Sequence, residues 1–316
     1  MNKSGIFPYP IKRLIAAIPT LLAIVTLAFF LMRLAPGGPF DREQRLPQQI
    51  RLNLEAAYGL DQPLLQQYFT YLGRVIRGDL GPSFRYPERS VNELIAQGLP
   101  VSATLGLCAL VLALLIGVPL GLFAGSNRNR FGARVLMGVA LVGIVLPAFV
   151  IAPLLALLFG VHLQWLPAAG WEQGAPQYLV LPVLALTLPL VAYIARLTRG
   201  GLLDVLGAPW LRTAQAKGLS RRAILLRHVL KPALLPVVSF LGPATAGILT
   251  GSLVIEQVFG LPGIGRYFVQ GALDRDYTLV IGVTLCYAAL IVALNFLVDL
   301  AYGWLDPASR RNAPAR

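Results

Sequence analysis

The stretch DVLGAPWLRTAQAKGLSRRAILLRHVLKPALLP, residues 204–236, is a basic segment between two long apolar runs. It is too polar to cross a membrane, and its pattern is helical. Pro209 suits the first turn of a helix because its missing N–H leaves no hydrogen bond unmade there. Gly218 supplies the left-handed residue that commonly ends a helix, and Ser220 can cap the next one. We therefore expect two short helices joined at Gly218.

The composition indicates an integral membrane protein. The chain is 56% hydrophobic and only 13% charged, whereas a soluble domain carries roughly 25% charged residues. A membrane span needs about 20 mostly apolar residues. Six runs meet this requirement, and they exclude a soluble enzyme or a nucleic-acid-binding module despite a net charge of +13. The expected spans are 11–34, 100–125, 135–160, 177–198, 233–256 and 277–303.

The basic residues predict the orientation. If both termini are inside, the inner segments hold seventeen Lys and Arg, and the two short outer loops hold two. Cytoplasmic loops carry the excess of positive charge, and long loops are exempt from this rule. We therefore expect 199–232 in the cytoplasm and the long loop 35–99 outside.

The outer loop contains a helix of its own by pattern. In PLLQQYFTYLGRVIR, residues 63–77, the apolar side chains recur at helical spacing, and Pro63 suits the helix start. The segment is too polar to span, so we expect it to pack as a lobe against the membrane bundle. The expected apolar face consists of Leu64, Leu65, Tyr68, Phe69, Leu72, Val75 and Ile76.

Two features allow more than one interpretation. Five prolines interrupt the central spans, and they indicate either a bent pathway wall or only the frequency of proline in membrane helices. The glycine-rich turn GLPGIG, 260–265, is an outer loop or a re-entrant pore loop, since such backbone is tolerated beside a cavity. The prolines are Pro119, Pro147, Pro153, Pro182 and Pro189.

The segment 204–236 resembles the coupling loop of ABC importer permeases. The general family pattern places Glu, Ala and Ala six, five and four residues before the glycine, whereas this chain has Arg212, Thr213 and Ala214. The form RTAQAKG followed by RHVLKPALLP is similar to the peptide-importing branch. The other interpretation is a basic loop held near anionic lipid. The resemblance implies a loop that couples to an ATPase, consisting of Pro209, Leu211, Arg212, Thr213, Ala214, Lys217 and Gly218.

Further motifs follow one another along the chain in an order that resembles the B-type permease subunit of bacterial oligopeptide importers. They are RLAPGGP (33–39), YGLDQP (58–63), QYF (67–69) and GDLGPSF (78–84). The run 256–277 resembles the signature outer loop of the peptide and nickel permeases. That resemblance implies a surface for a substrate-loaded binding protein, with Gly260, Pro262, Gly263, Gly265, Arg275, Asp276 and Tyr277.

The resemblance implies a fold and a set of partners. The fold is an all-α integral membrane protein with six transmembrane helices, the type I ABC importer permease fold, in one permease domain over 1–316. Residues 35–99 form an extracytoplasmic helical lobe, and 199–232 form a cytoplasmic loop with a coupling helix. The implied location is a bacterial inner membrane, in contact with lipid and with both termini cytoplasmic. The implied partners are a homologous second permease in a heterodimer, two ATP-binding-cassette ATPases and an extracytoplasmic peptide-binding protein.

Sequence motifs for enzymatic chemistry are missing. The chain has no G-x-x-x-x-G-K-[ST], G-x-S-x-G or H-E-x-x-H. We therefore expect no catalytic or metal site, no cofactor on this chain and no nucleic-acid partner, with ATP and Mg²⁺ held by the partner ATPases. Leu211 and Ala214 would contact an ATPase, and Gly218 would fix the angle to the next helix.

Two other functions stay open. One is an ABC permease for dipeptides, nickel or antimicrobial peptides, although the GGP and GPSFRY details favour oligopeptides. The other is a self-sufficient channel or carrier, and Glu256 and Asp299 are the only acids near span interiors. Such acids usually mark ion pathways, and a proton-coupled carrier normally needs more of them.

Overall fold

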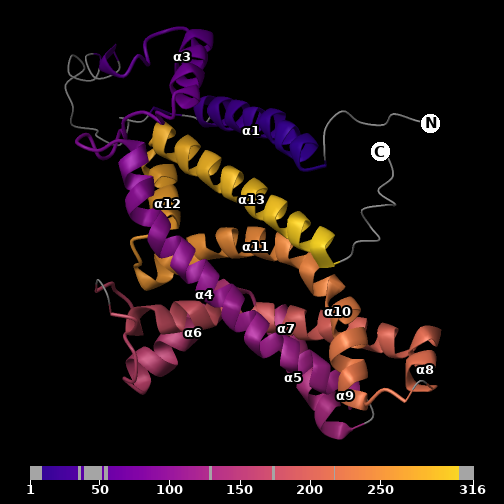
Figure 1. The fold of residues 1–316 in the computed structure, drawn as a ribbon. Helices are drawn as coiled ribbons and strands as arrows, with labels where there is room; N and C mark the ends of the chain where they lie inside the picture. Colours follow the sequence, from indigo (N-terminus) through magenta and orange to yellow (C-terminus); the bar gives the residue numbers. More distant parts are fainter. Residues whose placement is uncertain are drawn as a thin grey trace, which may run out of the picture. The chain divides into compact units, whose positions relative to one another are not determined.

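The computed structural model describes residues 9–34, 37–38, 52, 56–127, 130–172, 175–216 and 218–305 (Figure 1). For 9–14, 141, 212–215, 221–222, 226–227 and 302–305 it describes the backbone alone. The described residues are helical apart from turns and one isolated bridge between Pro82 and Ser90. Their helices are α1 (Tyr9–Leu34), α3 (Leu64–Ile76), α4 (Val91–Ser126), α5 (Phe131–Val145), α6 (Ala148–Leu155), η1 (Ala156–His162), α7 (Gln177–Leu206), α8 (Pro209–Ala216), α9 (Arg221–Ile224), η2 (Leu225–Val229), α10 (Leu230–Ala233), α11 (Leu235–Phe259), α12 (Ile264–Asp274) and α13 (Tyr277–Leu305).

Five helical stretches of the described chain are long and apolar enough to cross a membrane. A sixth crossing exists if the bent pair Phe131–Val145 and Ala148–His162 counts as one span. The expected all-helical membrane fold is confirmed. The five stretches are Ile15–Leu34, Val91–Ser126, Gln177–Leu206, Leu230–Phe259 and Tyr277–Ala301.

The third expected span, 135–160, is not one straight helix. It breaks between α5 and α6 with a bend of 100°. A residue before proline avoids the helical region, and Leu146, before Pro147, is extended with φ −80° and ψ 116°. Of the five span prolines, only Pro147 breaks its helix. The other four lie inside continuous helices, at Pro119, Pro153, Pro182 and Pro189.

The chain divides into two compact units. Unit 1 contains Ala103–Gly260 and the end of α13 from Ile291, and unit 2 contains Lys12–Ser102 and Leu261–Leu290. The expected coupling loop 199–232 lies in unit 1, and the described part of the expected lobe 35–99 lies in unit 2. The single permease domain over 1–316 stays a prediction.

Helix α7 is the centre of unit 1, where it contacts α5, α6, α10 and α11. Three glycines of α4, spaced four residues apart, let that helix approach α7 closely. A Cβ atom would lie 2.9 Å from the Ile194 Cβ if added at Gly117 and 2.5 Å from the Ala195 oxygen if added at Gly121. Small residues are the usual means of close packing between membrane helices, and this packing gives the segment after α7 a firm base.

Unit 2 confirms the helix predicted over 63–77. Pro63 precedes α3, and Tyr71 of α3 is buried in a cluster with Val25, Phe29 and Ile281. Only part of the expected apolar face is covered, however. The side chains of Leu65, Phe69 and Ile76 are among its exposed members.

Candidate functional site

The segment after α7 folds as the sequence predicts. Pro209 begins α8, and Gly218 has a left-handed φ of +76°. The Ser220 hydroxyl accepts a hydrogen bond from the Ala223 N–H at 3.3 Å, which caps α9. We call the segment from Pro209 to Ala233 the coupling hairpin.

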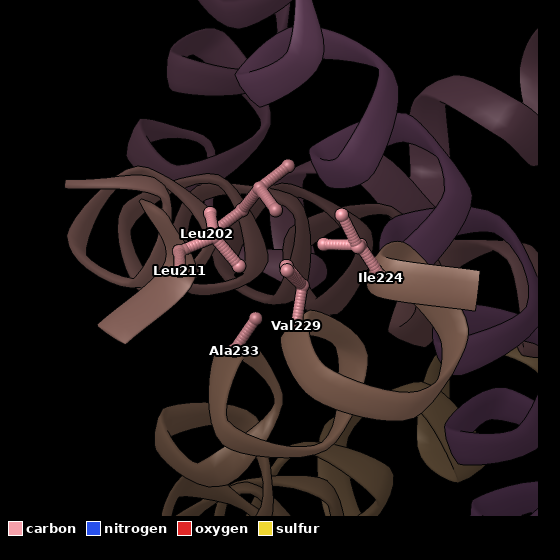
Figure 2. Close-up of a cluster of buried hydrophobic side chains, with 5 residues drawn as sticks. All are labelled: Leu202, Leu211, Ile224, Val229 and Ala233. Atoms are coloured by element: carbon pink, nitrogen blue, oxygen red, sulfur yellow. The ribbon is translucent and has the colours of Figure 1, made fainter. Parts of the chain in front are cut away.

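An apolar cluster fastens the coupling hairpin to α7. Figure 2 shows the five side chains gathered between α7, α8, α9, η2 and α10. Each is at most 7% exposed, and Leu122 and Val205 pack against them. Burying a side chain such as leucine stabilises by about 1.5–3 kcal/mol, so the hairpin is held by packing. The five are Leu202, Leu211, Ile224, Val229 and Ala233.

This packing corrects one expectation about α8. Leu211 is only 4% exposed, so its side chain anchors α8 and is not placed to touch a partner. The neighbouring Trp210 is 46% exposed and lies on the free side of the helix. Arg212, Thr213 and Ala214 lie in α8 with only their backbones described, and Lys217 lies outside the described residues.

The second half of the hairpin contains a π-helical turn, η2, between α9 and α10. Pro232 lacks the N–H that an α-helical turn would direct to the His228 carbonyl. Gly201 of α7 faces Ala233 so closely that an added Cβ would overlap the Ala233 carbonyl oxygen. The sequence did not predict this crossing, which fixes the end of the hairpin against α7.

A second candidate site lies in unit 2, where Asp276 is fully buried. Its carboxylate accepts hydrogen bonds from the Ser83 hydroxyl and from the Arg85 and Leu279 N–H groups, the last two at 3.1 Å. Asp276 thus caps the N-terminus of α13, and its hydrogen bonds connect the segment 78–86 to the start of this helix. We call these contacts the outer knot.

Aromatic contacts extend the outer knot. Tyr277, 5% exposed, donates its hydroxyl proton to the Gly37 carbonyl at 2.9 Å. The Arg33 guanidinium lies over the Tyr277 ring at 4.9 Å and over Phe29 at 4.6 Å. Phe84 meets Tyr277 edge to face. The motifs 33–39, 78–84 and 275–277, far apart in sequence, therefore meet at one place.

The residues expected to face a binding protein are largely occupied within the chain. Gly263, Gly265, Asp276 and Tyr277 are buried, whereas Gly260, Pro262 and Arg275 are half-buried. The side chains of Asp276 and Tyr277 bind their own chain, because they hold the knot described above. Of the seven residues, only the half-buried Gly260, Pro262 and Arg275 are therefore accessible enough to belong to a surface for a binding protein.

The glycine-rich turn is fixed against the start of α4. The Ile264 N–H donates to the Ser102 hydroxyl at 3.0 Å. A Cβ added at Gly98 would lie 2.8 Å from the Ile264 nitrogen, so the turn and α4 touch through backbone. Gly260, with φ +67°, ends α11 before the turn.

Helix α12, which follows the turn, is joined to the same knot. The Tyr86 hydroxyl donates to the Gln270 side-chain oxygen at 3.0 Å. Burial raises the pKa of the Tyr86 phenol, and the neighbouring Tyr267 raises it further. The hydroxyl therefore stays protonated at neutral pH. Among the described residues, no group of three or more His, Cys, Asp or Glu is placed to hold a metal ion.

The sequence of the chain matches a known family over residues 117–311, which include the coupling hairpin. The family is the binding-protein-dependent transport system inner membrane component. The chain belongs to this family. It is therefore a multi-pass protein of a bacterial inner membrane with a role in transport.

Two relatives match over nearly their whole length. The chain is 50% identical to the oligopeptide transport system permease protein OppB of Escherichia coli strain K12, over 95% of this chain and 98% of that protein. It is 46% identical to the dipeptide transport system permease protein DppB of Bacillus subtilis strain 168, over 95% and 96%.

A solved structure of the MetNI methionine ABC transporter in an inward-facing conformation has the same fold. It covers 67% of this chain and 96% of the solved chain, with a TM-score of 0.54 and 16% identity.

Sequence reasoning missed several residues that build these sites. Sequence reasoning assigns Trp210 no role, because Trp210 and Leu211 are adjacent apolar residues and the pattern does not tell the exposed side of α8 from the packed side. Ser83 and Arg33 were noted only as members of motifs. No spacing signal points to their contacts, because the motifs that hold these residues lie far apart along the chain.

Proposed function

We propose that this chain is the membrane-spanning permease subunit of an ABC importer that carries oligopeptides into the cytoplasm. The observation that carries the proposal is the 50% identity to the oligopeptide permease OppB over nearly the full length of both chains. The coupling hairpin supports the proposal, because a helical element packed firmly against α7 can transmit the movement of a separate ATPase subunit to the membrane helices.

The proposed complex contains three kinds of partner. A homologous second permease completes the pathway wall, two ATPase subunits bind ATP and Mg²⁺, and an extracytoplasmic protein delivers the peptide. Both termini and the coupling hairpin face the cytoplasm, as the excess of positive charge in those segments supports. This chain itself holds no nucleotide and catalyses no reaction.

The proposed mechanism uses the coupling hairpin as a lever. When the ATPases close on ATP they move α8, and the cluster beneath Leu211 passes this movement to α7 and to the helices around it. A two-state change requires a difference in contact free energy between the states. The exposed side of α8, including Trp210, supplies that difference by docking.

Co-purification followed by reconstitution tests the proposal. The tagged chain is extracted in a gentle detergent, and the proteins that stay attached are identified by mass spectrometry. We expect a second permease and P-loop ATPases, and ATP-dependent uptake of a labelled pentapeptide after reconstitution with the binding protein. Recovery of the chain alone, with transport in liposomes without ATP, would favour a self-sufficient channel instead.

A dipeptide importer is the second candidate, because the chain is 46% identical to the dipeptide permease DppB of Bacillus subtilis. The same vesicles distinguish the two candidates. If labelled pentapeptide is taken up and excess unlabelled dipeptide does not inhibit this uptake, the result supports an oligopeptide importer. Uptake of dipeptide alone supports the second candidate.

A further inference from the structure

Helix α3 has two apolar faces, and only one of them is packed. Tyr68, Tyr71 and Val75 face α1, and Tyr71 is only 7% exposed. The second face holds side chains at spacings of four, three and four residues, which places them in one stripe along the helix. Leu65, Phe69 and Ile76 are 64%, 65% and 78% exposed, and Leu72 between them is half-buried. We call these four residues the α3 stripe.

The contacts of the packed face give the depth of α3 relative to the membrane span. The hydroxyl groups of Thr26 and Tyr68 hydrogen-bond at 2.9 Å, and the rings of Phe29 and Tyr68 lie 5.4 Å apart. Arg33 at the end of α1 donates through Nε to the Gln67 side-chain oxygen at 3.1 Å. Helix α3 therefore packs along the last two turns of α1, and Figure 1 shows it beside that end.

Those two turns lie within the apolar span. The charged residues Lys12, Arg13 and Arg33 bracket the apolar run of α1. At 1.5 Å per residue the run is about 28 Å long, which matches the roughly 30 Å of bilayer hydrocarbon. Thr26 precedes Arg33 by seven residues, so the contact with Tyr68 lies about 10 Å inside the end of the span.

The neighbouring surface of α1 is itself suited to lipid. Leu27 and Leu31 are 62% and 65% exposed, and Ile15–Leu34 is the least buried of the five apolar stretches in the described chain. The α3 stripe continues this apolar surface within the same unit. The remaining side of α3 is polar, with Gln66, Thr70 and Arg74.

We propose that α3 is an interfacial helix whose stripe of Leu65, Phe69, Leu72 and Ile76 lies in the acyl chains of the leaflet at the Arg33 end of α1. An amphipathic helix of this kind buries its apolar face about 5–10 Å below the headgroups, which agrees with the depth of the Tyr68 contact. The exposed Arg77 at the end of α3 is placed to reach lipid phosphates. The lobe is thereby fixed to the bilayer as well as to α1.

Spin-label accessibility tests this proposal in the full complex, reconstituted into vesicles of phosphatidylethanolamine and phosphatidylglycerol. The free cysteines are first removed as Cys108→Ala and Cys286→Ala. A nitroxide is then attached at Phe69→Cys or Leu65→Cys on the stripe, and at Gln66→Cys on the polar side as the matched control. Collision rates are measured with oxygen, which concentrates in acyl chains, and with a water-soluble nickel chelate.

The expected result is that oxygen collides more often than nickel with the labels at 65 and 69, and that the order reverses at 66. If the nickel chelate collides more often than oxygen with the labels at 65 and 69, the stripe lies in water and the proposal is overturned. Low rates with both reagents would overturn it by placing a protein subunit on the stripe. Peptide uptake by each labelled complex, equal to that of the cysteine-free complex, establishes that the variants are folded.

Discussion

The coupling hairpin and the outer knot are held in opposite ways. Five apolar side chains fasten the hairpin to α7, whereas hydrogen bonds to one buried carboxylate, Asp276, hold the knot. Packing spreads its stabilisation over many contacts and leaves Trp210, on the other side of α8, exposed. In the outer knot the stabilisation is concentrated in Asp276. The side chains of the family motif, Asp276 and Tyr277, are themselves the ones that make these internal contacts. A family motif can therefore lie in a segment held by apolar packing in one region and in a set of internal hydrogen bonds in another.

The largest expected effect is at the knot. Asp276→Ala leaves two buried donors, the Ser83 hydroxyl and the Leu279 N–H, and the part-buried Arg85 N–H without their acceptor. An unsatisfied buried donor costs about 1–3 kcal/mol, so we expect a loss on the order of 4 kcal/mol in the free energy of unfolding. Denaturant titration of the detergent-solubilised chain measures it. Asp274→Ala is the matched control, because its contact with Arg85 at 3.5 Å is partly exposed and should cost little. Equal effects from the two variants would show that the knot does not depend on burial.

The hairpin should respond more moderately to the loss of one anchor. Leu211→Ala removes part of a shared cluster, and we expect a cost of about 2–3 kcal/mol, in the lower part of the range for buried leucine. ATP hydrolysis by the assembled complex should continue while peptide uptake falls, since α8 no longer moves with α7. Leu219→Ala, at a residue that is 39% exposed, is the control and should leave stability within about 0.5 kcal/mol. Coupled uptake by Leu211→Ala would contradict the lever.

The smallest of the three effects concerns the turn between α8 and α9. Gly218→Ala places a side chain at φ +76°, which costs about 1–2 kcal/mol. Gly200→Ala is a close control, because an added Cβ meets no neighbour within 4 Å at either position and residue 200 is helical. Alanine favours a helix over glycine by about 1 kcal/mol, so the two variants should shift the thermal midpoint in opposite directions. If both variants shift the thermal midpoint in the same direction, the left-handed backbone conformation of Gly218 does not determine the stability of this turn.

Local signals predicted much of this molecule. The helix over 63–77, the left-handed Gly218 and the Ser220 cap depend on neighbours within a few residues, and the structure has all three. The family motifs also lie in the segments that form the coupling hairpin and the outer knot, and the functional roles of these segments stay predictions.

What the sequence could not supply are contacts between distant residues. Ser83 and Asp276 are separated by 193 residues, and no spacing rule connects them. Leu211 and Trp210 are adjacent and both apolar, so the packed side of α8 depends on where α7 lies. Among the five span prolines, only Pro147 breaks its helix, and the sequence around the five does not single it out. The first two of these outcomes are decided by tertiary packing.

Photo-crosslinking in whole cells tests the central claim most directly. The crosslinking residue p-benzoylphenylalanine replaces Trp210 in one strain and Trp165 in another, since both tryptophans are exposed, at 46% and 70%. If the coupling hairpin docks an ATPase, position 210 crosslinks to a P-loop ATPase subunit. Position 165 does not, because it lies in the short loop between the expected spans 135–160 and 177–198, which the charge rule predicts to be outside. An intact complex that gives no ATPase crosslink from 210, or gives one from 165, would contradict the account.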